Sequence, residues 1–167
     1  NPPYDPIKSF TPVSLVGRYI YVLVSSPSVP VNTAAELIAY GRNNPGKLNY
    51  GSYSGVTQLM HTKLKDDAKM DINLIPYKGE GPTINDILGG HVQFTFATPA
   101  SSQAHVKDGK LKALAILLPK RSPMMPEIPT AAEAGLPPLG ADTWAALFGP
   151  ANMPPAITTR MNEAGQP

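Results

Sequence analysis

Residues 48–76, LNYGSYSGVTQLMHTKLKDDAKMDINLIP, predict a strand, a helix and a second strand in succession. The first strand is expected at 48–51, the helix at about 56–68 and the second strand at 72–76. Strands joined through a helix are typically parallel neighbours, because a short turn cannot connect two parallel strands. The stretch therefore indicates an α/β fold.

The same alternation continues on both sides of this stretch. On the N-terminal side, 11–25 is rich in β-branched and aromatic residues, with an interruption expected at Gly17-Arg18. Thr33 and Glu36 form a capping box that begins a helix, and this helix ends at 43–46. On the C-terminal side we expect a helix at 82–88, a strand at 92–96, a helix at 101–107 and a strand at 111–118. The order predicts a mostly parallel sheet with helices on both faces.

The C-terminal part has a different character. Prolines and glycines become frequent from residue 119 onward, and the whole chain contains 20 prolines. A helix is expected at 130–134, an extended segment at 143–148 and a final helix at about 155–163. This tail is predicted to leave the first sheet.

Composition excludes several classes of function. The 167 residues are 42% hydrophobic and 16% charged, which is typical of a folded globular protein. The net charge is +2 and the basic residues are scattered, so nucleic acid is an unexpected partner. No cysteine is present, which excludes disulfides and thiolate metal sites. No apolar run is long enough to span a bilayer, and the first residues do not form a signal peptide.

The turn at 50–57 is the clearest candidate site. It joins a predicted strand to a predicted helix, where ligands of open α/β sheets bind. Small residues allow backbone amides to converge, hydroxyl groups add donors, and the helix dipole favours an anion. The bland alternative, that Ser54 only caps the helix, is compatible with binding. The expected ligand-binding residues are Ser52, Ser54, Gly55, Val56 and Thr57, with Thr98 and Ser101 from a second strand-to-helix junction.

The sequence offers no catalytic constellation, metal site or cofactor motif. A hydrolase elbow needs serine at the centre of G-x-S-x-G, but Tyr53 stands there. His61, His91 and His105 are isolated, and Gly79-Glu80-Gly81 is expected to form a turn. The enzyme alternative, a small hydrolase that uses Ser54, lacks an evident base.

An ordered set of motifs resembles the Bug family of solute-binding receptors. The motifs extend over nearly the whole chain, and the ordered set is specific although no single one is decisive. They are 4–6 (YDP), 10–13 (FTPV), 44–50 (NPGKLNY), 76–79 (PYKG), 86–90 (DILGG), 109–115 (GKLKALA), 120–123 (KRSP), 128–130 (IPT), 133–135 (EAG) and Trp144.

The resemblance implies a periplasmic receptor of a tripartite tricarboxylate transporter. Members have two α/β lobes that close around a small, usually carboxylate-bearing ligand and deliver it to membrane subunits. The resemblance therefore implies a role in transport and not in catalysis, and it implies no cofactor. Presentation of the ligand to a sensor protein is the alternative role. The chain would then be one lobe of a two-lobed, periplasmic-binding-protein-like fold.

By this mapping, residues 1–10 are a crossover segment, 11–138 the second lobe and 139–167 a return segment toward a first lobe. The chain is thus expected to be a fragment. Two positions depart from the family pattern, at Gln58-Leu59 and at Ala97-Thr98. A missing carboxylate at Ala97 favours a ligand that is not an amino acid. Apolar residues of the return segment are expected to promote self-association, notably Trp144, Leu147 and Phe148.

Overall fold

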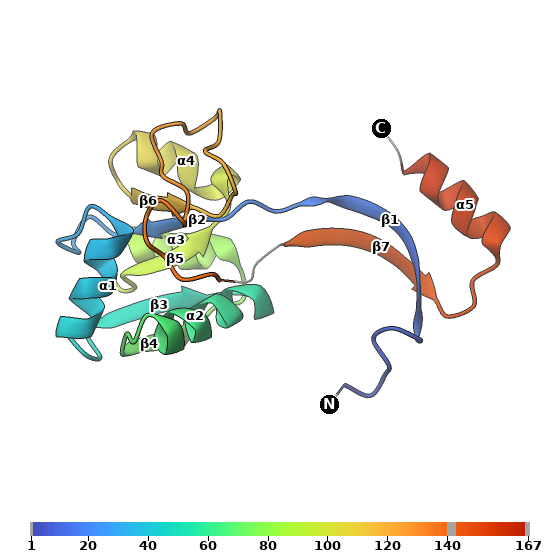
Figure 1. Cartoon of the computed structure of the whole chain (residues 1–167), viewed down its shortest axis with the longest axis horizontal. Helices are drawn as coiled ribbons and strands as arrows, with labels where there is room; N and C mark the ends of the chain where they lie inside the picture. The colour runs from blue at the N-terminus through green and yellow to red at the C-terminus, as the bar shows by residue number, and fades with distance from the viewer. Residues whose placement is uncertain (1, 140–142, 166–167) are drawn as a thin grey trace. The chain divides into compact units, whose positions relative to one another are not determined.

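The computed structural model describes residues 2–139 and 143–165, and the chain forms two compact units (Figure 1). The larger unit is Ile20–Ala141, and the smaller one combines Asn1–Tyr19 with Asp142–Pro167. The larger unit is the α/β part that the sequence predicts. Its observed start at Ile20 differs from the expected boundary at residue 11, because the first strand pairs within the smaller unit.

A five-stranded sheet forms the centre of the larger unit, in the order β4-β3-β5-β2-β6. β3 is parallel to β4 and β5, whereas β2 is antiparallel to both of its neighbours. Four strands therefore share one direction, which confirms the mostly parallel sheet, and β2 runs against them. The strands are β2 (Val22–Ser25), β3 (Leu48–Ser52), β4 (Ile72–Pro76), β5 (Phe94–Ala97) and β6 (Lys112–Ile116).

Helices cover both faces of this sheet, as predicted (Figure 1). A hydrophobic core lies on each face, and the side chains of β2 alternate between the two. Leu23 is buried in one core, and Val22 and Val24 are buried in the other. Side chains of α1 and α2 join the first core, and those of α3 and α4 pack against the second. The helices are α1 (Ala34–Asn43), α2 (Gly55–Asp67), α3 (Glu80–Leu88) and α4 (Pro99–Lys107).

Local signals place the ends of these helices. Thr33 caps α1 by accepting a hydrogen bond from the Glu36 N–H at 3.1 Å. The Glu36 carboxylate reaches back one residue further than a capping box requires and accepts from the Asn32 N–H at 2.6 Å. α3 ends at Leu88, and Gly90 follows with φ of 79°, a conformation that glycine adopts without strain.

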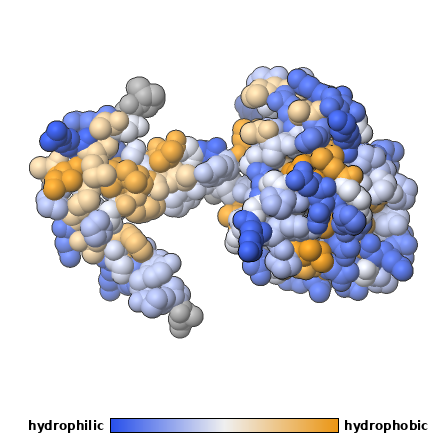
Figure 2. Space-filling model, turned by 180° about the vertical axis from the view of Figure 1, so that it is seen from behind, coloured by the Kyte–Doolittle hydropathy of each residue, from blue (hydrophilic) through white to orange (hydrophobic). Residues whose placement is uncertain are grey.

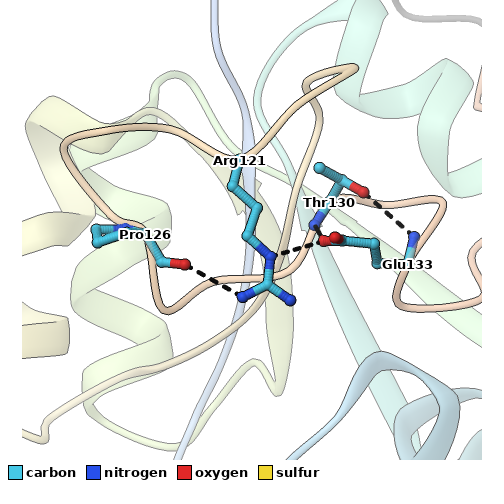
Figure 3. A network of polar contacts seen from close by, with 4 residues as sticks. All are labelled: Arg121, Pro126, Thr130 and Glu133. Carbon is cyan, nitrogen blue, oxygen red and sulfur yellow. Dashed lines mark hydrogen bonds and ion pairs between the residues drawn. The ribbon is translucent and has the colours of Figure 1, made fainter.

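The helix predicted at 130–134 is wrong, because a turn stands there. Thr130 and Glu133 form reciprocal capping contacts, with the Thr130 N–H donating to Glu133 at 2.8 Å. The Leu136 N–H then bonds to the Ala131 carbonyl and closes the turn before helix can continue. Arg121 donates to the same Glu133 carboxylate at 2.9 Å, which ties the turn to the preceding loop (Figure 3).

The smaller unit is an antiparallel ribbon with one helix. β1 (Phe10–Arg18) pairs with β7 (Trp144–Pro150), and α5 (Pro155–Ala164) follows β7. The strand region expected at 11–25 is therefore two strands, β1 and β2, that belong to different units. The extended segment and the final helix of the tail are confirmed.

Candidate functional site

Three strand-to-helix junctions meet at one edge of the sheet. The parallel strands β3, β4 and β5 end at Ser52, Pro76 and Ala97, and α2, α3 and α4 follow them. The carboxyl ends of parallel strands lie at the same sheet edge, where ligands of such folds bind. The two junctions that the sequence analysis selected, 52–57 and 98–101, are therefore neighbours in space.

The turn before α2 is held together by hydroxyl groups. Ser54 is the N-cap of α2, and its Oγ accepts from the Thr57 N–H at 3.2 Å. The Thr57 Oγ1 in return accepts from the N–H groups of Tyr53 and Ser54, at 3.1 and 3.0 Å. Ser52 Oγ lies 3.1 Å from Thr57 Oγ1. Ser52 and Thr57 are buried, so their side chains shape the turn from within.

The exposed part of this turn is Ser54 and Gly55, with Val56 half-buried. The first turn of a helix leaves its N–H groups without acceptors inside the helix. Ser54 satisfies the amide of Thr57, and the amides of Gly55 and Val56 remain for an outside acceptor. The first turn of α2 contains no acidic residue. A ligand carboxylate at this end would be favoured by these amides and by the helix dipole.

The junction before α4 is already occupied by a carboxylate of the chain itself. Glu80, the first residue of α3, accepts from the Thr98 Oγ1 at 3.0 Å and from the Ser101 Oγ at 2.6 Å. The Thr98 N–H donates to the same carboxylate. The hydroxyl groups of Thr98 and Ser101 therefore donate to Glu80. Because Glu80 already uses these donors, the structure does not favour the direct contact with a ligand that the sequence predicted.

Tyr53 connects the two junctions. Its hydroxyl donates to the Phe96 carbonyl at 3.0 Å, at the end of β5. Burial raises the pKa of Tyr53 above its ordinary value, and the negative charge of Glu80 raises this pKa further. Tyr53 is therefore a neutral donor over the whole physiological pH range. It fixes the turn before α2 beside the carboxylate of Glu80, which binds the junction before α4.

Sequence reasoning missed Glu80. The Gly79-Glu80-Gly81 segment predicts a turn, whereas Glu80 begins a helix of nine residues. A detectable signal was present: a carboxylate that follows one parallel strand lies at the same edge as the hydroxyl groups that follow the next. The sequence predicts no carboxylate near Ala97, but the Glu80 carboxylate supplies one, because it accepts a hydrogen bond from the N–H of the next residue, Thr98.

Histidine 61 has a structural environment. It is buried, and its Nε2 lies 3.2 Å from the Ile72 carbonyl oxygen. Burial lowers the pKa of His61. Among the described residues, no three side chains of the types that bind metal ions come together as a ligand set.

The two glycines of the turn have different roles, and this gives a prediction. A Cβ on Gly51 would come within 2.4 Å of the Thr83 Cγ2, whereas a Cβ on Gly55 meets no atom within 4 Å. Gly51→Ala should destabilise the fold by about 1–3 kcal/mol, because α3 packs directly on this glycine. Gly55→Ala, the matched control, should leave the unfolding free energy nearly unchanged. Urea denaturation of both variants measures this, and equal stabilities would contradict it.

Comparison with known proteins identifies the class and then the family. The α/β unit with its mixed sheet is one lobe of a periplasmic-binding-protein-like structure. Residues 1–166 match the tripartite tricarboxylate transporter family receptor. The chain therefore belongs to this receptor family, as the motif order predicted.

Individual relatives agree with this assignment. The chain is 34% identical over 162 residues to the protein BugT of Bordetella pertussis, covering 96% of this chain and 50% of BugT. MatC from Rhodopseudomonas palustris, solved with bound malate, superposes with a TM-score of 0.88 at 29% identity, covering 98% of this chain and 56% of MatC. A second R. palustris protein, solved with adipate, has a TM-score of 0.86 and 32% identity, with 97% and 55% coverage.

The chain thus spans about half the length of the curated relatives that it matches. Within the described residues, none of the helices is both long and apolar enough to cross a membrane. The relatives are solute-binding receptors, and two of them were solved with small carboxylates.

Proposed function

We propose that this chain forms one lobe of a periplasmic receptor that binds a small carboxylate-bearing metabolite for a tripartite tricarboxylate transporter. The observation that carries the proposal is the exposed N-terminus of α2, which offers amides and a hydroxyl group without a resident carboxylate. α1 and α3 have Glu36 and Glu80 in their first turns, and α4 receives Glu80. Malate and adipate in the solved relatives support an anionic ligand.

The proposed roles of the site residues follow from their exposure. The amides of Gly55 and Val56 and the hydroxyl of Ser54 bind the ligand carboxylate. Ser52 and Thr57 keep the turn in its conformation through their buried contact. Thr98 and Ser101 act on the ligand through Glu80, which they hold in place.

The complete receptor is proposed to need a second lobe. The relatives are about twice as long as this chain, so the ligand would be enclosed between two lobes. One open lobe supplies only a few solvated hydrogen bonds, each worth on the order of 1 kcal/mol net. This is too little to offset the freedom that a small ligand loses on binding. The closed receptor would then dock on the membrane subunits of the transporter.

A receptor is favoured over a serine hydrolase by the surroundings of Ser54. Its Oγ contacts the Oγ1 and N–H of Thr57, at 3.2 Å each. Neither group is a general base, which a serine nucleophile requires. The hydroxyl of Ser54 is therefore used for capping and binding.

The test is to identify the ligand directly. Mass spectrometry of small molecules released on denaturation, from a receptor that carries this chain as one lobe, should show a bound carboxylate. Calorimetric titration with malate, adipate and related acids then ranks the candidates. A receptor that releases no carboxylate and binds none of the panel contradicts the proposal.

A further inference from the structure

The carboxylate of Glu80 is held in place at the site by hydrogen bonds from the junction before α4. Three donors converge on it, namely the Thr98 N–H, the Thr98 Oγ1 and the Ser101 Oγ. The Tyr53 hydroxyl also lies within hydrogen-bonding reach of this carboxylate, so Glu80 joins the junctions before α2 and α4. Oε1 accepts two of the three bonds from Thr98 and Ser101, and Oε2 accepts one. Glu80 is half-buried and keeps contact with solvent.

Glu80 also changes the charge of this sheet edge. Without it, α2 and α4 would present two helix N-termini side by side, and both would favour an anion. Glu80 fills the α4 terminus with a negative charge and leaves the α2 terminus open. Tyr53, which lies next to Ser54, brings the two termini together through its bond to the Phe96 carbonyl. A ligand bound at α2 would therefore lie near the negative charge of Glu80.

We infer that Glu80 is a specificity-determining residue that admits one carboxylate to this lobe and selects a ligand whose other end carries a hydrogen-bond donor. This inference rests on the proposed function, with the ligand carboxylate at α2. The second carboxylate of a dicarboxylate would be repelled by Glu80, because like charges a few ångströms apart disfavour each other. A hydroxyl, amide or ammonium group would instead donate a hydrogen bond to the half-buried Glu80 carboxylate.

The test compares two ligands of equal length, adipate and adipate monoamide, in a receptor that carries this chain as one lobe. The wild type should bind the monoamide about tenfold more tightly than adipate. Glu80→Gln keeps acceptor oxygen for Ser101 but removes the charge, and should bring the ratio of the two dissociation constants close to one. Glu80→Ala removes the carboxylate from the α4 terminus and should bind adipate more tightly than the monoamide. This variant replaces Glu80→Gln in the test if the glutamine variant is unstable.

The control is Glu127→Gln, which changes the net charge equally on an exposed residue after β6, in the segment that leads to Thr130. Its ratio of the dissociation constants for adipate and adipate monoamide should equal that of the wild type. A ratio unchanged in folded Glu80 variants, as judged by circular dichroism, overturns the inference while the proposed function stands. If the wild type binds no carboxylate of the panel, the proposed function fails and the inference fails with it.

Discussion

Gly55→Glu should abolish carboxylate binding while the protein remains as stable as the wild type or becomes more stable. The new side chain has room, because a Cβ at residue 55 meets no atom within 4 Å. An acidic residue in the first turn of a helix stabilises it by about 0.3–1 kcal/mol, and α2 has none. The same carboxylate would occupy or repel the ligand position, so we expect a loss of affinity of at least about 100-fold.

Calorimetric titration and urea denaturation of the same preparation separate the two effects. Gly55→Gln is the matched control, because it has the same size without the charge and should lose much less affinity. Most variants that lose binding also lose stability, and this one should not. If Gly55→Glu bound the carboxylate with the affinity of the wild type, the anion site could not lie at the N-terminus of α2.

Much of the larger unit could be predicted because its signals are local. The strand expected at 72–76 is β4 in the structure, and Thr33 caps α1 as predicted, although the Glu36 carboxylate accepts from Asn32 and not from Thr33. The reversed direction of β2 could not be predicted, since apolar alternation is the same in both directions of a strand. The capping contacts of Thr130 and Glu133 formed without a helix, because Gly135 with φ of 72° and the Leu136 bond end the turn.

The strand-to-helix junctions of the candidate site could be predicted from the sequence, but the partners of their hydroxyl groups could not. The hydroxyl groups of Ser52 and Thr57 indicated ligand contacts, but they are buried and bind each other. Thr98 and Ser101 were expected to face a ligand, and the structure gives their hydroxyl groups to Glu80. Residue type and spacing locate a strand-to-helix junction, whereas the partner of each hydroxyl group depends on which helices pack side by side.

The smaller unit has too little buried surface to explain its own folding. Eleven of the fourteen exposed large hydrophobic side chains in the described part of the chain belong to it. Val13 is its one buried hydrophobic residue among those described, and α5 buries none. Figure 2 shows hydrophobic residues gathered over this part of the surface. Such a surface is typical of an interface, so we expect another chain segment or a second copy to cover it.

An aromatic cluster on the ribbon is the centre of this surface. The Phe148 ring lies 6.1 Å from that of Trp144, in a tilted arrangement, and 6.4 Å from that of Phe10, edge to face, measured between ring centroids. Trp144 and Phe148 are 53% and 44% exposed, which leaves large apolar area to bury. Burying about half of each side chain would contribute roughly 1 kcal/mol or more per residue.

The 167-residue chain alone should therefore self-associate, and Trp144→Ser with Phe148→Ser should weaken the association by about 10- to 100-fold. Sedimentation over a range of concentrations measures the dissociation constants. Leu59→Ser is the matched control, because Leu59 is 50% exposed but lies on α2 in the larger unit. It should leave the dissociation constant unchanged. A monomeric wild type would contradict self-association. If Leu59→Ser weakened the association as much as the double substitution, the chain would associate through exposed hydrophobic residues in general and not through the aromatic cluster.

In a receptor that contains both lobes, the aromatic cluster should instead be covered within the molecule, and the same double substitution should lower stability without changing the mass.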